Sequence, residues 1–174
     1  MATSFYDLCV PGYLQTLSAV GGCLDKALAH CKEHGVDPAQ IVETRLFPDM
    51  LPFRFQIRSV VHHSVGALEG IQRGKFEPPR EPPVLPDYPA LQAMVAEAGE
   101  AMKKFTPEAV NGLEGKDLIF QLGERQLPFT AVGFVSSFSL PNFYFHAATA
   151  YDILRSKGVP LGKRDFLGRL RMKS

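Results

Sequence analysis

The sequence predicts an all-α fold in which four long helices pack around one core. Apolar residues recur at steps of three and four in four segments, which is the spacing of an amphipathic helix. The connection between the second and third segments is rich in proline and too long for a tight turn. Because the chain has 174 residues and is 45% hydrophobic, it can bury a sizeable core, and we expect a single domain over residues 1–174.

The first predicted helix covers residues 4–34, and Gly35 supplies its stop signal. Its apolar seam consists of Val10, Leu14, Leu17, Gly21, Leu24, Leu28 and Cys31. Cys9, Cys23 and Cys31 all fall in this segment, where a helix holds them on related faces. We therefore expect reduced thiols rather than a disulfide framework, in a soluble cytoplasmic protein.

The second predicted helix covers residues 53–73 and ends at Gly74, after a connection that contains several prolines. Its apolar stripe consists of Ile57, Val60, Val61, Ala67, Leu68 and Ile71. Residues 74–89 contain six prolines, a density that favours a stiff, extended strap. Such a crossover could traverse the domain and let the second and third helices run parallel.

The third predicted helix covers residues 89–105, with Asp87 near its start. The segment "KDLIFQLGERQLPF" predicts a small β-hairpin around Gly123 and Glu124, with glycine in the position that a type II′ turn requires. The last helix is expected over residues 130–157, where Pro141 either bends it or marks a start. Residues 159–174 form a short basic tail.

The charge balance argues against a nucleic-acid or membrane partner. Nineteen basic residues face eighteen acidic ones, for a formal charge of +1, so no global field attracts a polyanion. The basic residues of the tail are Lys163, Arg164, Arg169, Arg171 and Lys173; a solvated terminus explains them better than an RNA or phospholipid site. No stretch approaches the roughly 20 apolar residues that span a bilayer.

The histidines differ in what helical phase predicts for them. His30 and His34 have the spacing of a zinc-binding helix, but they flank Lys32 in the last turn of the first helix, where cations complement the helix dipole. With about 100° per residue, His63 lies closer to the apolar stripe of its helix than His62 does. His63 is then either a site residue or a core-edge histidine that is satisfied by a backbone carbonyl.

Polar residues with the same phase extend this picture to both helices. On the second helix, Gln56 and Ser59 lie on the stripe of His63. On the last helix, Asn142, His146 and Thr149 share one stripe beside the apolar face. Convergent polar groups in an apolar bundle must satisfy one another, bind water or bind a ligand. Tyr144 is a further candidate that could reach such a cavity.

Three segments resemble a known family: "FYDLCVPGYLQTL", "LFPDMLPFRFQIRSVVHH" and "LPNFYFHAATAYDILRSKGVPLGKRDFLG". They are similar to the domain of unknown function nineteen ninety-three, a branch of the DinB/YfiT-like superfamily. The resemblance implies an up-down-down-up four-helix bundle. Superfamily members often bind a divalent metal through three histidines, and some are thiol-dependent transferases or isomerases. His63 and His146 match two of those positions, whereas Asn142 occupies the third.

Two classes of function are consistent with these residues. The first is a small-molecule enzyme with its pocket between the second and last helices. One version binds Zn or Ni through His63, His146 and Asn142; the version that we prefer has no tightly bound metal and uses the two histidines, or Tyr144, for proton transfer, with Gln56, Ser59, Asn142 and Thr149 binding the ligand. The alternative is a non-catalytic ligand-binding or stress-related module. We expect a homodimer in either case.

Overall fold

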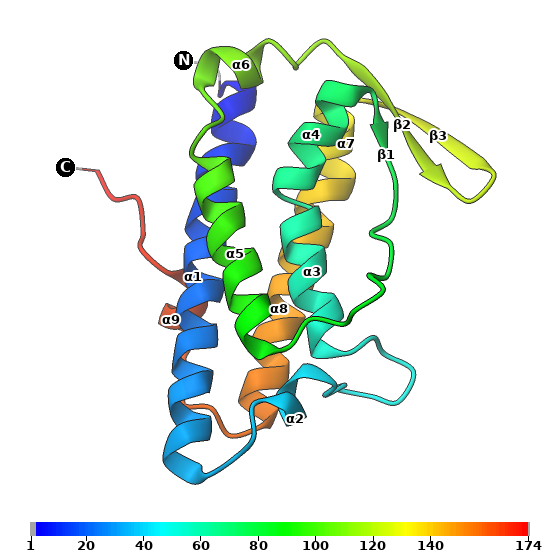
Figure 1. Cartoon of the computed structure of the whole chain (residues 1–174). Coiled ribbons are helices and arrows are strands. Elements are labelled where there is room, and N and C mark those ends of the chain that lie inside the picture. Colours follow the sequence, from blue (N-terminus) through cyan, green and yellow to red (C-terminus); the bar gives the residue numbers. More distant parts are fainter. Residues whose placement is uncertain (1–2, 174) are drawn as a thin grey trace.

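The structure is a computed structural model that describes residues 3–173, and it is mostly helical with one small sheet (Figure 1). Its longest helices are joined by short helices and by the proline-rich strap. In chain order the helices are α1 (Phe5–His34), α2 (Ala39–Val42), α3 (Phe53–His62), α4 (Val65–Arg73), α5 (Tyr88–Met102), α6 (Pro107–Asn111), α7 (Ala131–Phe134), the π-helix η1 (Val135–Ser139), α8 (Leu140–Ser156) and α9 (Lys163–Leu167). The strands are β1 (Lys75–Phe76), β2 (Asp117–Leu122) and β3 (Arg125–Thr130).

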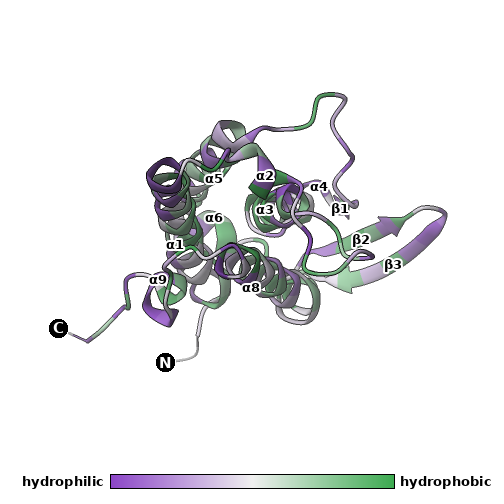
Figure 2. Cartoon of the chain, turned by 90° about the horizontal axis from the view of Figure 1, so that it is seen from below, coloured by the Kyte–Doolittle hydropathy of each residue, from purple (hydrophilic) through white to green (hydrophobic). Residues whose placement is uncertain are grey.

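The long helices lie alongside one another in four columns: α1, α3 with α4, α5, and α7 with η1 and α8 (Figure 1). The strap brings the chain back to the lower end of the molecule, so α3–α4 and α5 run in the same direction while α1 and α8 run opposite to them. The main packing pairs are α1 with α5 and α3 with α8. Seen from below, these helices surround a common centre, with the hairpin outside it (Figure 2).

Helix α1 begins and ends where the sequence predicts. The Ser4 side chain accepts a hydrogen bond from the Asp7 backbone N–H, and Gly35 adopts a left-handed conformation with φ of 64°. The predicted apolar seam is wrong at Leu28, which is 36% exposed. The buried face of α1 is centred on other residues. That face includes Cys9, Tyr13, Val20, Cys23 and Ala27. All three cysteines are buried free thiols.

The second predicted helix is broken at its centre, so the expectation of one helix over residues 53–73 is wrong. His63 ends α3 with φ −83° and ψ 3°, and Ser64 then adopts φ −108° and ψ −87° before α4 begins. The Ser64 hydroxyl donates to the carbonyl oxygens of Val60 and Val61 at 2.8 Å and 3.0 Å. A serine hydroxyl competes with the helical N–H groups for such carbonyls, which explains a break at this residue.

The predicted hairpin is present as β2 and β3, paired antiparallel from Asp117–Thr130 to Leu122–Arg125. Gly123 has φ of 59° while Glu124 keeps a negative φ, which fits a type II′ turn rather than a type I′ turn. A third strand was not expected: β1 pairs parallel with β2 through Lys75 and Phe76. At two residues it is too short for any pattern to reveal, and it makes the fold mostly helical rather than wholly α.

The last helical column contains a change of helix type. Thr130 caps α7 by accepting from the Gly133 N–H at 3.1 Å, residues 135–139 form the π-helix η1, and Pro141 lies in the first turn of α8. The backbone is helical on both sides of it, because Ser139 and Leu140 have α-helical dihedral angles and the Leu140 N–H donates to the Val135 carbonyl oxygen. Pro141 therefore lies inside the column, where the helix type changes from π to α, and does not mark a start.

The C-terminal segment is not simply a solvated tail. Residues 163–167 form α9, which packs on α1, and Lys26 Nζ lies 2.6 Å from Asp165 Oδ1. Val159 and Leu161 before it are buried. The basic side chains of the segment are nevertheless exposed, as expected. Among residues 3–173, no helix is both long and apolar enough to cross a membrane.

The strap is fastened to one stripe of α3. Arg54 and Arg58 both bind the Glu81 carboxylate, with Arg58 Nη1 3.2 Å from Glu81 Oε2, and His62 Nε2 lies 2.7 Å from the Glu77 carbonyl oxygen. These three donors recur every four residues along α3, so they lie one above the other. The strap is therefore held against α3 along its first half.

Candidate functional site

The centre of the candidate site is a hydrogen bond between α3 and α8. His146 Nδ1 lies 2.7 Å from Gln56 Oε1, while Gln56 Nε2 donates to the Leu51 carbonyl oxygen at 2.9 Å. Because Nε2 is the donor to Leu51, the amide oxygen of Gln56 is the group that faces His146. An amide oxygen only accepts, so His146 must carry its proton on Nδ1 and has a lone pair on Nε2.

His63 lies beside this pair, at the end of α3. Its side chain is only 6% exposed, and its ring stacks on that of His146 with centroids 5.9 Å apart and planes 17° from parallel. The rings of Phe76 and Phe138 each lie 5.5 Å from it. His63 Nδ1 is buried and forms no hydrogen bond with any residue in the described part of the chain. A buried polar atom without a partner is costly, so this nitrogen is the strongest sign of a ligand position.

Both imidazoles are neutral near pH 7. Burial lowers the pKa of His63 to about 3, with the neighbouring His62 and His146 adding to the effect. Burial alone lowers the pKa of His146 to about 4. Charged imidazolium is poorly solvated among apolar rings, which is why the neutral form prevails. The two side chains therefore offer lone pairs and N–H groups, not positive charge.

The backbone of His63 is fixed by a buried chain of hydroxyls. Ser139 Oγ donates to the His63 carbonyl oxygen at 2.7 Å, and the Tyr13 hydroxyl lies 2.9 Å from Ser139 Oγ. Since the Ser139 proton is used toward His63, Tyr13 is the donor in the second bond. These hydrogen bonds join α1, η1 and the α3–α4 break. They give a partner to the His63 carbonyl oxygen, which lies at the break in the helix.

Of the other polar candidates, Asn142 and Thr149 form hydrogen bonds within their own helical column. Ser59 is buried on α3, one turn after Gln56. Asn142 Nδ2 donates to the Phe138 carbonyl oxygen at 2.7 Å, and Thr149 Oγ1 donates to the Phe145 carbonyl oxygen at 2.8 Å. Both bonds stay within the same helical column, and Asn142 retains its second amide N–H and its amide oxygen for a ligand.

Tyr144 lies away from the His63–His146 pair, and His62 is more buried than its helical phase indicates. Tyr144 is 42% exposed, and its hydroxyl approaches Gly12 on α1, 3.0 Å from where a Cβ on that glycine would be. His62 was expected to point to solvent; instead it is half-buried and bonded to the strap, because the strap covers that side of α3. His30 and His34 contact each other at the exposed end of α1.

Sequence reasoning did not identify the aromatic rim of the site. Phe55 and Phe145 lie edge-on to the His146 ring, with centroid distances of 5.9 Å and 5.2 Å. Phe145 is 59% exposed, so an apolar edge leads from the surface to His146. A phenylalanine next to a candidate histidine is the only local signal that could have indicated this rim. Ser139 was also missed; Tyr13 was considered only as a residue that could reach a cavity, and its contact with Ser139 involves the π-helix.

A tightly held metal does not fit these residues. No group of three or more His, Cys, Asp or Glu side chains in residues 3–173 lies close enough to hold an ion. His63 and His146 supply two imidazoles, and the bond of His146 Nδ1 to Gln56 leaves its Nε2 lone pair free, so what is lacking is a strong third ligand. The third group, the Asn142 amide, is a weak ligand for zinc or nickel, which prefer imidazole and thiolate.

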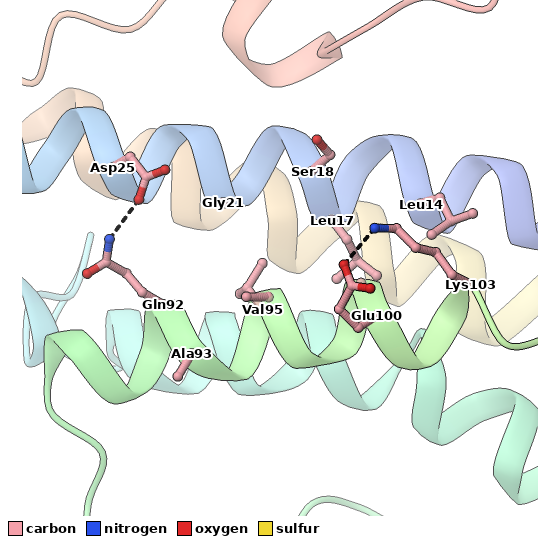
Figure 3. Close-up of a pocket in the computed structure, with 12 residues that line it drawn as sticks. Leu14, Leu17, Ser18, Gly21, Asp25, Gln92, Ala93, Val95, Glu100 and Lys103 are labelled. Atoms are coloured by element: carbon pink, nitrogen blue, oxygen red, sulfur yellow. Dashed lines mark hydrogen bonds and ion pairs between the residues drawn. The ribbon is translucent and has the colours of Figure 1, made fainter.

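The surface cavities described next are not lined by Gln56, His63 or His146. A groove of about 520 Å³ runs between α1 and α5, with Gly21 and Val95 along its middle (Figure 3). Its polar side chains pair at the two ends, where Gln92 Nε2 donates to Asp25 Oδ1 at 2.8 Å and Lys103 Nζ donates to Glu100 Oε1 at 2.6 Å. These groups pair with one another, which leaves Ser18 as the other polar side chain that lines the groove.

Comparisons with known proteins agree with the fold. A family model described as "Domain of unknown function (DUF1993)" matches residues 5–167. A solved structure, the crystal structure of a DinB family member protein from Shewanella denitrificans, is similar with a TM-score of 0.80 and 23% identity, covering 97% of this chain and 94% of that one. At this identity the likeness concerns the fold alone. No match was found among curated proteins.

Proposed function

This chain belongs to the DUF1993 family, as three segments of its sequence indicated, and we propose that it is a small-molecule enzyme that works at Gln56, His63 and His146 without a tightly bound metal. The observation that carries the proposal is the unpaired, buried Nδ1 of His63 beside the oriented ring of His146. Two imidazoles that are stacked at 5.9 Å, one of them with an unmet hydrogen bond, form a position for a polar ligand group in an apolar setting.

His146 is the proton acceptor in this proposal. Gln56 holds its proton on Nδ1, which leaves the Nε2 lone pair free. The low pKa of His146, about 4, keeps that nitrogen unprotonated at any pH near neutrality. Orientation by a second residue is how histidine bases are commonly held in one tautomer. Gln56 is therefore a positioning residue rather than a catalytic one.

The same pKa values argue against a histidine as proton donor. With a pKa of about 3, His63 is almost never protonated near pH 7. It acts instead through its neutral ring, by hydrogen bonding the ligand through Nδ1. Of the residues considered as acids, Tyr144 lies toward Gly12 of α1, so the proton that the leaving or accepting group needs comes from the ligand or from water.

The alternative function is a non-catalytic ligand-binding or stress-related module, in the form of a homodimer. One observation favours it: a base whose pKa is about 4 is poorly matched to proton transfer at pH 7. In this function His63 Nδ1 and the rim of Phe55 and Phe145 recognise an apolar ligand with one polar group, and no bond is made or broken.

The proposal also takes the four helical columns as the up-down-down-up bundle of the DinB/YfiT-like superfamily. Support comes from the packing of α1 on α5 and of α3 on α8, and from the crossover that the strap provides. In such bundles, sites form in the core between facing helices, and the contact between α3 and α8 is where Gln56 meets His146.

The test is a screen of small molecules against tag-free protein, with ligand binding followed by NMR and turnover by product analysis. We expect ligands that shift the signals of His63 and His146, and we expect His146→Ala to abolish turnover while His30→Ala, at the exposed end of α1, leaves it unchanged. Ligand binding without turnover for any compound would support the binding module instead. Near-stoichiometric zinc, nickel or iron in the purified protein would overturn the metal-free form.

A further inference from the structure

A second concave site lies on the other side of α3, where the strap leaves α4. It is a pocket of about 560 Å³ at the junction of α3, α4, β1 and the strap. We call it the basic pocket. The residues that line it are His62, Arg73, Lys75, Phe76, Glu77, Pro78, Pro79 and Arg80.

The charge of this pocket differs from that of the chain as a whole. Three cationic side chains, Arg73, Lys75 and Arg80, face one carboxylate, Glu77, in a protein whose overall charge is only +1. Lys75 Nζ lies 3.1 Å from Glu77 Oε1, which neutralises that pair, and Arg73 Nη1 lies 3.5 Å from Glu69 Oε2, an exposed carboxylate that offsets part of the arginine charge. The Arg80 guanidinium forms no ion pair with any residue between positions 3 and 173. Cations that gather around a concavity focus a positive potential there.

His62 reports the same positive surroundings independently. Burial lowers its pKa, and the charges of Arg58 and Arg73 lower it further, against the hydrogen bond from its ring to the Glu77 carbonyl. Two arginines from different helices thus act on one imidazole at the floor of the pocket. The imidazole is neutral near pH 7, and an anion placed beside it would be attracted by the guanidinium charges.

The walls of the pocket are built to keep their shape. His62 Nε2 holds the strap through Glu77 O at 2.7 Å, and β1 is fixed by its pairing with β2 at Lys75 and Phe76. Pro78 and Pro79 restrict the backbone between these anchors and Arg80. The cations are therefore carried by a segment whose backbone is already ordered, which lowers the entropic cost of binding.

We propose that the basic pocket binds a small dianionic oxyacid, with phosphate or the phosphate group of a monoester as its ligand, held by Arg73, Lys75 and Arg80. Arginine donors in a planar fork match the oxygen geometry of phosphate. A volume of about 560 Å³ leaves room for a small organic group beside the phosphate. This site is distinct from the His63–His146 pair and does not depend on the function proposed for that pair.

The test is a titration of the full chain with inorganic phosphate at constant ionic strength, followed by backbone amide NMR. We expect saturable shifts at residues 73–80, and at least tenfold weaker binding for the double variant Lys75→Gln, Arg80→Gln. Both side chains are exposed, so the fold should survive; the control is Lys103→Gln, Lys104→Gln, which removes the same charge from the turn after α5 and should leave the affinity unchanged.

A second arm replaces phosphate by acetate, a monoanion, and by the monoester glycerol phosphate. We expect no saturable shift with acetate and binding of the monoester at least as tight as that of phosphate. Shifts spread over the whole surface, or an equal loss of affinity in the two double variants, would mean an unspecific charge effect and would overturn the proposal. So would the absence of saturation with phosphate.

Discussion

Gln56 and His146 are joined side chain to side chain at 2.7 Å, and the Leu51 carbonyl fixes which end of the Gln56 amide takes part. The relationship is directional: Leu51 orients Gln56, and Gln56 selects the Nδ1–H tautomer of His146. A residue outside the helix thus determines which nitrogen of a helical histidine is free. The state of His146 can therefore be changed without altering His146 itself.

Replacing Gln56 by leucine should allow His146 to adopt either neutral tautomer. Gln56→Leu leaves the buried His146 Nδ1–H and the Leu51 carbonyl without their partner, so we expect a loss of about 1–3 kcal/mol in the free energy of unfolding. Nitrogen-15 NMR of His146 should show Nδ1–H alone in the wild-type protein and a mixture of tautomers in the variant. The control is Gln72→Leu on the exposed face of α4. A wild-type spectrum with Nε2–H dominant would contradict the assignment.

The stability of the protein should fall as the pH drops below about 6.5. The folded pKa values of His63 and His146, about 3 and about 4, lie below the ordinary value of 6.5, so the unfolded chain takes up protons there that the folded chain does not. Their contribution is complete above pH 6.5 and declines toward pH 4, by roughly 1–2 kcal/mol per histidine at pH 5.

Urea unfolding at pH 7, 6 and 5 measures this dependence. His63→Gln should flatten the slope between pH 6.5 and 5, whereas His30→Gln should leave it as in the wild-type protein. The pKa values of Glu81 and Asp165 are lowered by their partners Arg54 and Lys26, so these carboxylates act below their ordinary values near 4 and outside this window. Equal slopes in wild type and His63→Gln would refute the buried neutral state of His63.

The hydroxyl chain from Tyr13 through Ser139 to His63 should behave as one unit. Ser139→Ala removes the donor to the His63 carbonyl and the acceptor of Tyr13, so we expect a loss of about 1–3 kcal/mol in unfolding free energy. In that background Tyr13→Phe should cost less than it does alone, because the hydroxyl has already lost its partner. A double-mutant cycle by denaturant unfolding tests this; additive losses would mean that the bonds are independent. Ser136→Ala, at an exposed position of η1, is the control.

Glycine-to-alanine changes should raise the free energy of unfolding at some helical positions and lower it at others. At Gly22 in α1 and Gly99 in α5, a Cβ would meet nothing within 4 Å, so alanine should stabilise by about 0.5–1 kcal/mol. At Gly70 in α4, a Cβ would lie 3.0 Å from Phe76 Cδ2 and 3.2 Å from the Lys75 carbonyl oxygen. Gly70→Ala should therefore destabilise by about 1–3 kcal/mol. Thermal unfolding of the three variants decides; a rise in Tm for Gly70→Ala would show that β1 does not rest on α4.

Long periodic helices were predictable because their signals are redundant. In α1, the repeated apolar steps and Gly35 together indicated a helix that ends at residue 34. The hairpin was equally clear from Gly123. By contrast, β1 and α9 are held by partners elsewhere in the chain, β2 for one and α1 for the other, so local patterns could not predict them.

The site was predictable to the level of helix faces and no further. Helical phase directed Gln56, His63 and His146 inward, and the structure brings these three together. It could not predict the α3–α4 break, because continuous periodicity persists through His63 and Ser64 while the interruption comes from a serine hydroxyl. Nor could it predict that the side chains of Asn142 and Thr149 would donate hydrogen bonds to backbone carbonyls of their own helical column.

The π-helix η1 has a consequence for how the last helical column is registered. An α-helix advances about 100° per residue, and a π turn accommodates an additional residue by closing i→i+5 hydrogen bonds. Residues 135–139 therefore hold one residue more than an α-helical turn of nearly the same rotation would. Removal of one residue from Val135–Ser139 would let this turn close as α-helix with little change in the orientation of α7 relative to α8. The π turn thus acts as a local insertion in one helical column, and it sets which side chains, Ser139 among them, face Tyr13 and His63.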